Sequence, residues 1–105
     1  MIVEYIRYAI PEDQAIRFAQ AWEEAGKILQ SSSHCLSYEI SQCSEDKKQF
    51  TVRIEWDSLD GHLKGFRTGP GFRGFFGAVQ PFYTMIEEMH HYTPSSSFTK
   101  PQKSR

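Results

Sequence analysis

Residues 49–56 alternate between apolar and polar side chains more regularly than any other part of the chain. The apolar positions of this segment are Phe50, Val52, Ile54 and Trp56. Successive side chains of a β-strand point to opposite faces of a sheet, so the pattern predicts a strand with one buried face. The chain is thereby limited to folds that contain a sheet with at least one face covered by other elements.

Three other segments carry strand patterns, at residues 2–10, 35–43 and 84–92. In the second of these segments, Leu36, Tyr38 and Ile40 are expected to share one face of the sheet. The first and third segments have apolar residues at both odd and even positions, which point to opposite faces of a strand. This predicts that both faces of their strands are covered.

Two segments have the apolar spacing of amphipathic helices. The first begins at Pro11, and its apolar stripe consists of Ala15, Phe18, Ala19, Trp22, Ala25 and Leu29. The second begins after Asp57, with Ser58 as the expected N-cap, and a Gly- and Pro-rich stretch at residues 68–71 interrupts it. It resumes with apolar residues at positions 72, 75, 76 and 79 and is expected to end at Pro81.

The predicted elements follow the order βαββαβ, which is the ferredoxin-like pattern of the α+β class. Its four strands would form one antiparallel sheet with both helical segments on one face. The chain has no further element to cover the other face, so we expect a homodimer through this open sheet face. Residues 1–92 are predicted to form the domain, and residues 93–105 a flexible C-terminal tail.

Charge and composition exclude several classes of protein. The chain has 105 residues, which suits one domain, and its formal net charge of -1 gives no electrostatic basis for binding nucleic acid. No stretch approaches the roughly 20 apolar residues of a membrane span, and the N-terminus lacks a signal-peptide pattern. Cys35 and Cys43 would lie too far apart on one strand for a disulfide, so we expect reduced thiols and a cytoplasmic protein. His34 and Cys35 are adjacent at the start of a predicted strand, but no second pair lies at zinc-ligand spacing, so we expect no metal.

Aromatic residues are abundant for so short a domain. Eight Phe, five Tyr and two Trp make up 14% of the chain. A small monomer has too little interior to bury all of these rings. The surplus predicts a pocket lined by rings, a subunit interface, or both.

The stretch IEWDSLDGHLKGFR, at residues 54–67, joins a strand to a helix with the pattern His-Leu-x-x-Phe. The stretch GFRGFF at residues 71–76 and the pair Pro81-Phe82 follow it. Together these motifs resemble the antibiotic biosynthesis monooxygenase domain, which is a dimeric α+β barrel. The resemblance covers residues 2–92, and its most specific part is the strand-to-helix join with the Phe-rich helix after it.

The resemblance implies a pocket between helices and sheet in each subunit. Characterised members oxidise electron-rich aromatics, such as quinols or polyketide phenols, with O2 and without metal or flavin. We therefore expect a cofactor-independent monooxygenase of a small quinol or phenol. The alternatives are a non-catalytic module that binds a small molecule, and a haem-degrading enzyme. Haem degradation in related proteins uses an asparagine on the first strand, and this chain contains no Asn.

His62 is the candidate catalytic residue, because an imidazole with an ordinary pKa near ~6.5 can accept a proton from a hydroquinone at neutral pH. The candidate substrate-binding residues are Trp56, Phe66, Phe72, Phe76 and His90. His62 and the phenylalanines also suit an ordinary core, so both interpretations stay open. His90 and His91 are adjacent in a strand and must point to opposite faces, so they cannot bind one metal together.

Overall fold

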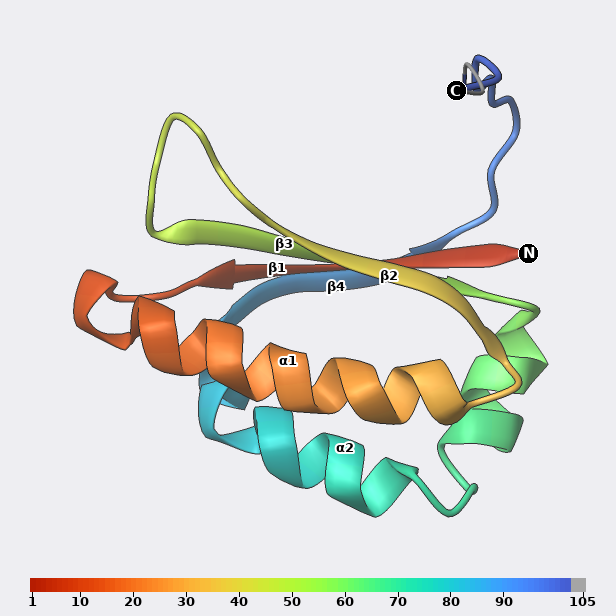
Figure 1. The fold of residues 1–105 in the computed structure, drawn as a ribbon, viewed down its shortest axis with the longest axis horizontal. Helices are drawn as coiled ribbons and strands as arrows, with labels where there is room; N and C mark the ends of the chain where they lie inside the picture. Colours follow the sequence, from red (N-terminus) through yellow and green to blue (C-terminus); the bar gives the residue numbers. More distant parts are fainter. Residues whose placement is uncertain (103–105) are drawn as a thin grey trace.

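The computed structural model describes residues 1–102, which contain one four-stranded antiparallel sheet. The strands are β1 (Ile2–Ala9), β2 (Cys35–Gln42), β3 (Gln49–Trp56) and β4 (Ile86–Tyr92), in the spatial order β2-β3-β1-β4. Helices α1 (Ala15–Ser31) and α2 (Phe72–Val79) both cover the same face of the sheet (Figure 1). The predicted ferredoxin-like α+β fold is confirmed.

Three short helical segments complete the described fold. They are the 3-10 helices η1 (Glu12–Gln14) and η3 (Gln80–Met85) and the π-helix η2 (Gly61–Phe66). Pro81 lies in the first turn of η3, where a missing N–H costs nothing, so the chain continues as a helix beyond α2. As a result β4 begins at Ile86, two residues later than predicted.

The core lies between the sheet and the helices because each of these elements turns its apolar side there. The four apolar residues of β3 are all buried, as the alternation predicted. From α1, Phe18, Trp22 and Leu29 are fully buried against the sheet. The Phe18 ring packs edge-on against Tyr8 of β1, with ring centroids 4.8 Å apart.

The prediction for Leu36 is wrong. The pairing of β2 with β3 shifts between Cys35 and Ser37, so Leu36 is an extra residue that bulges from the strand. Its side chain is 56% exposed, whereas Tyr38 and Ile40 pack against the core. A bulge reverses the alternation that a regular strand would have kept.

The other face of the sheet carries no element of the described chain (Figure 1). Tyr5 and Tyr92 meet edge to face on it and are partly exposed. The homodimer through this face stays a prediction, which the mass of the protein in solution would decide. Residues 93–102 form no helix or strand, while the rest of the predicted tail lies outside the described residues. Within residues 1–102, no helix has the length and apolar character needed to cross a bilayer.

Candidate active site

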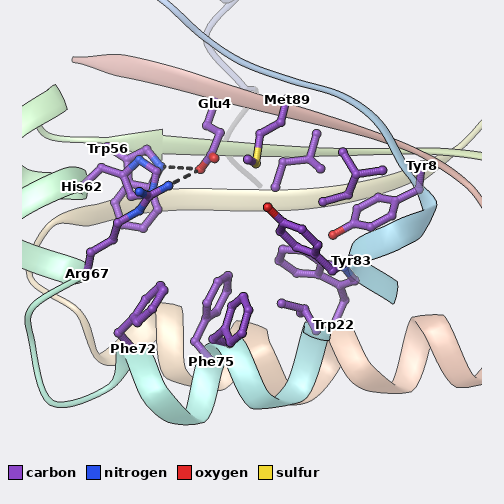
Figure 2. A pocket seen from close by; sticks show the side chains of 14 residues that line it. Glu4, Tyr8, Trp22, Trp56, His62, Arg67, Phe72, Phe75, Tyr83 and Met89 are labelled. Atoms are coloured by element: carbon purple, nitrogen blue, oxygen red, sulfur yellow. Dashed lines mark hydrogen bonds and ion pairs between the residues drawn. The ribbon is translucent and has the colours of Figure 1, made fainter. Parts of the chain in front are cut away.

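A cavity of about 410 Å³ lies between the helix-covered face of the sheet and α2. Its lining is mainly apolar and aromatic, with a few polar groups (Figure 2). The residues that line it are Glu4, Ile6, Tyr8, Trp22, Trp56, His62, Arg67, Phe72, Phe75, Phe76, Val79, Tyr83, Ile86 and Met89. A mainly apolar cavity of this size with a few convergent polar groups has the form of a small-molecule site.

Of the predicted site residues, Trp56, His62, Phe72 and Phe76 line the cavity. Phe66 does not, since its ring is buried behind the cavity wall. It packs between Trp56 and Phe75, with ring centroids 5.1 and 5.2 Å away. Phe66 is therefore part of the core that supports Trp56, and it does not line the cavity as predicted.

The prediction that His90 faces the cavity side is wrong. In the β1–β4 ladder, Ile6 pairs with Met89 and Glu4 pairs with His91, so His91 shares their face and His90 lies on the open face. The register shifts where β4 passes Arg7, and Glu87 is the extra residue there. Because of this bulge, Ile86 and His91 lie on the same face although their numbers differ in parity.

The helix that carries His62 is wound with i+5 hydrogen bonds rather than i+4. The Arg67 N–H donates to the His62 carbonyl oxygen at 3.1 Å. Residues five apart therefore lie one turn apart, which brings Arg67 to the cavity beside His62. The Ser58 hydroxyl accepts the Gly61 N–H at 2.8 Å at the start of this segment, as its predicted N-cap role requires.

Glycine allows this helix to pack closely against its neighbours. A Cβ atom at Gly61 would collide with the Asp57 carboxylate, and one at Gly65 would collide with the His34 ring. The His34 and Asp57 side chains are themselves bound to each other, with Nδ1 and Oδ2 2.9 Å apart. The pair and the two glycines thus fix the position of the backbone around His62.

His62 and Glu4 form a buried polar cluster at one end of the cavity (Figure 2). The Trp56 indole N–H donates to Glu4 Oε1 at 3.1 Å, and His62 Nε2 lies 3.7 Å from the same oxygen. The His62 ring stacks on Trp56 with centroids 4.2 Å apart and planes 6° from parallel. Its other nitrogen, Nδ1, is hydrogen-bonded to Nε2 of His91 at 2.8 Å.

Burial dominates the protonation of this cluster. It raises the pKa of the Glu4 carboxyl, against the opposing effects of the Trp56 N–H and the Arg67 charge. It lowers the pKa of His62 to about 4, and the neighbouring His91 and Arg67 act in the same direction. The pKa of His62 thus lies well below the ordinary imidazole value that the sequence led us to expect, so His62 is a weaker base than predicted.

The opposite end of the cavity holds a second group of polar atoms. The Tyr8 and Tyr83 hydroxyls point into the cavity (Figure 2). Trp22 is fully buried, and its indole N–H makes no well-formed hydrogen bond among the described residues. The Tyr8 hydroxyl is a neighbouring acceptor for this N–H, because its contact with Trp22 partly offsets the burial that raises the pKa of Tyr8.

Comparison with known proteins decides the family. The family model described as antibiotic biosynthesis monooxygenase matches residues 1–78. The chain belongs to this family.

Similar proteins agree with this assignment. Among curated relatives, the uncharacterised protein YczJ of Bacillus subtilis is 24% identical over 92 residues, covering 88% of this chain and 97% of its own. SnoaB of Streptomyces nogalater, a cofactor-independent oxygenase solved as a mutant, superimposes with a TM-score of 0.77 at 10% identity, covering 94% and 97% of the two chains. A conserved protein of Methanosarcina mazei gives a TM-score of 0.71 at 16% identity, covering 87% and 89%. At these identities the structural matches establish the fold.

In this member of the antibiotic biosynthesis monooxygenase family, Glu4, His62 and His91 could also hold a metal ion. Their donor atoms lie within 4.8 Å of one another. Two features of the site oppose a cation there. The 2.8 Å separation of the two imidazole nitrogens is that of a direct hydrogen bond, and the positive charge of Arg67 lies close enough to lower the pKa of both histidines.

Sequence reasoning missed several residues of the site in this family member. Glu4 shares its parity with Ile6 and Tyr8, so a carboxylate on an apolar strand face was an available signal. Phe75 could have been predicted from the helical spacing. Arg67 and His91 could not have been predicted, because their positions depend on the π-helical winding of η2 and on the β4 bulge.

Proposed function

We propose that the chain is a monooxygenase that oxidises a small phenol or quinol with O2, without a cofactor, in the cavity beside His62. The single observation that carries this proposal is an aromatic-lined cavity with a buried imidazole and carboxylate at one end. Family membership supports the oxygenase class. The description of SnoaB as a cofactor-independent oxygenase supports the absence of a cofactor.

The cavity would bind the substrate ring between Trp56, Phe72 and Phe75 and exclude water. His62 Nε2 would accept the proton of a ring hydroxyl, and the Arg67 guanidinium would stabilise the oxyanion that forms. The electron-rich anion can then reduce O2 directly. For a substrate whose reacting carbon is a CH2 group, that carbon becomes a carbonyl and the second oxygen atom leaves as water, so the substrate supplies all four electrons.

Oxygen consumption tests this function. Chelator-treated protein is mixed with a panel of quinols and phenols in an oxygen electrode, and the products are identified by mass. We expect uptake with at least one compound, and a loss of about 10²–10⁴-fold in kcat for His62→Ala. His90→Ala is the matched control, because His90 lies on the other face of the sheet, and its rate should stay within about twofold of wild type.

Equal rates for wild type and His62→Ala would remove His62 from the mechanism. The absence of uptake with every compound, combined with saturable binding in calorimetry, would instead favour a binding module. One observation favours this alternative: a neutral imidazole whose pKa is lowered to about 4 holds a proton poorly. Any mechanism that uses His62 must therefore send the proton onward.

A further inference from the structure

His62 connects the cavity to a second imidazole at the edge of the sheet. Its Nδ1 is hydrogen-bonded to His91 Nε2 at 2.8 Å, and the two ring centroids are 4.9 Å apart. The His62 side chain is 6% exposed and the His91 side chain 25%. His91 lies on β4, which is an edge strand. The two rings thus lead from the buried cavity wall to the solvent.

We propose that His62 and His91 form a proton relay that carries the substrate proton from the cavity to solvent, with His91 as the exit. This inference rests on the proposed function for the placement of an acidic hydroxyl at His62 Nε2. It goes beyond that function because it assigns a role to His91, which lies outside the cavity lining. In this relay His62 passes the proton on to His91 and does not keep it.

Burial explains why the proton should not stay on His62. A charged imidazole in an apolar site loses its hydration, and neither carboxylate oxygen of Glu4 is close enough to His62 Nε2 for a hydrogen bond. If His62 releases one proton from Nδ1 while it accepts another at Nε2, the ring remains neutral throughout. The hydrogen bond to His91 is on the nitrogen that such an exchange requires.

The proton balance is complete in both directions. In the resting state His62 carries its proton on Nδ1, and His91 carries its proton on its own Nδ1. The substrate hydroxyl gives its proton to His62 Nε2, His62 Nδ1 gives its proton to His91 Nε2, and His91 Nδ1 gives its proton to water. The reverse sequence returns one proton to the oxygen that leaves as water, which restores both tautomers.

Charged groups around the relay come from three elements. Glu4 on β1 lies with its two carboxylate oxygens 3.7 Å from His62 Nε2 and 3.9 Å from His91 Nε2. A negative charge there stabilises a proton in transit between the rings. Burial lowers the pKa of His91, and the charges of Arg67, after η2, and of His90, on β4, act in the same direction. These charged groups together favour transfer of the proton through the two histidines and disfavour a stable imidazolium on either of them.

The first experiment reads the tautomers and needs no activity. Long-range ¹H–¹⁵N correlation spectra of ¹⁵N-histidine protein are recorded at pH 7, with His62→Gln and His91→Gln used for assignment. We expect His62 neutral with its proton on Nδ1, so that Nε2 offers a lone pair to the cavity. A proton on Nε2, with His91 donating to Nδ1, would overturn the relay.

The second experiment measures proton removal from a bound phenol. 4-Nitrophenol is bound to the protein, and the absorbance of the phenolate is followed after a pH jump. We expect His91→Phe and His91→Gln to slow ionisation by about 10²-fold with little change in the Kd of the phenol. His90→Phe, the same replacement one residue away on the opposite face, removes only an electrostatic influence on His91 and should change the rate by less than about twofold.

The glutamine variant separates a relay from a structural role. Glutamine can replace the hydrogen bond to His62 Nδ1, but it cannot take up a proton at one atom and release it from another. Full recovery of the rate in His91→Gln would therefore overturn the relay. Cobalt(II) titration gives a further test. The relay would also be overturned if the protein bound one equivalent of cobalt(II) and the visible absorption of the bound ion were lost in both Glu4→Gln and His91→Phe, because the cluster would then be a metal site.

If no quinol is oxidised but ionisation of the bound phenol still depends on His91, the proposed function fails and the relay stands.

Discussion

Among the described residues, His34 and Asp57 form an exposed histidine–carboxylate pair, and His62 and Glu4 form a buried pair whose carboxylate also lies near His91. In the exposed pair, His34 Nδ1 lies 2.9 Å from Asp57 Oδ2, and the side chains are 37% and 41% exposed. In the buried pair, His62 Nε2 lies 3.7 Å from Glu4 Oε1, and the side chains are 6% and 5% exposed. The hydrogen bond to His34 lowers the pKa of Asp57, whereas burial raises the pKa of Glu4.

This comparison shows that burial, more than separation, decides what a pair of these residues can do. Water keeps both partners of the exposed pair well solvated, so charge on them costs little and the pair mainly supports the backbone near Gly61. In the buried pair, charge on either partner is costly. Under the proposed relay this cost disfavours a proton that stays on His62, whereas the exposed pair has only a structural contact to the backbone near Gly61.

Trp56→Ala should cause the largest loss of stability, because the Trp56 side chain contacts both partners of the buried pair. Trp56 is 1% exposed, stacks on His62 and donates to Glu4. We expect a loss of about 3–5 kcal/mol in the free energy of unfolding, measured by urea denaturation. The control, Leu36→Ala, affects an exposed side chain and should cost less than about 0.5 kcal/mol. Similar losses in both variants would contradict the difference in burial on which the comparison rests.

The buried pair should also make stability depend on pH. Because the pKa of His62 falls from 6.5 to about 4 on folding, the unfolded chain binds more protons between these values, and stability declines as pH falls through them. This contribution is about 3 kcal/mol. The raised pKa of Glu4 acts oppositely, since stability from its protonation is lost as pH rises above 4.5.

A difference measurement isolates His62. The free energy of unfolding is determined in urea at several pH values for wild type and His62→Gln, and the wild-type decline at acidic pH should be the steeper one. His90→Gln should follow wild type. Parallel curves for wild type and His62→Gln would mean that His62 titrates as an ordinary exposed imidazole.

The smallest changes in stability are expected from two glycine substitutions. Gly61→Ala tests the exposed pair, and Gly77→Ala is its control. In Gly61→Ala the new methyl group displaces the Asp57 carboxylate and separates it from His34, at a cost of about 1–2 kcal/mol. Gly77 lies in α2, and a Cβ atom there meets nothing within 4 Å. Gly77→Ala should therefore stabilise the protein by about 0.5–1 kcal/mol through helix propensity. Thermal unfolding would reveal the opposite signs, and two stabilising substitutions would show that the His34–Asp57 contact does not restrict Gly61.

Much of the fold was predictable because the patterns that determine it are local. The alternation in β3 and the apolar stripe of α1 led to the correct elements and to the correct buried residues, except that Ala19 of the predicted stripe is exposed. For the site, Trp56 and His62 were predictable from the strand-to-helix join. The placement of Phe66 was not predictable, because helical spacing cannot tell a ring that lines a cavity from one that supports the wall behind it.

The sequence by itself determined the four strands, the two helices, their order, and the fact that His90 and His91 point to opposite sides of the sheet. Only the tertiary structure decided which of the two faces the cavity side, because the extra residue Glu87 in the β4 ladder reverses the alternation. It also decided that Arg67 lies beside His62, because η2 is wound with i+5 hydrogen bonds. Local periodicity fixes the relation between neighbouring side chains, whereas long-range pairing fixes which face of the molecule each side chain occupies.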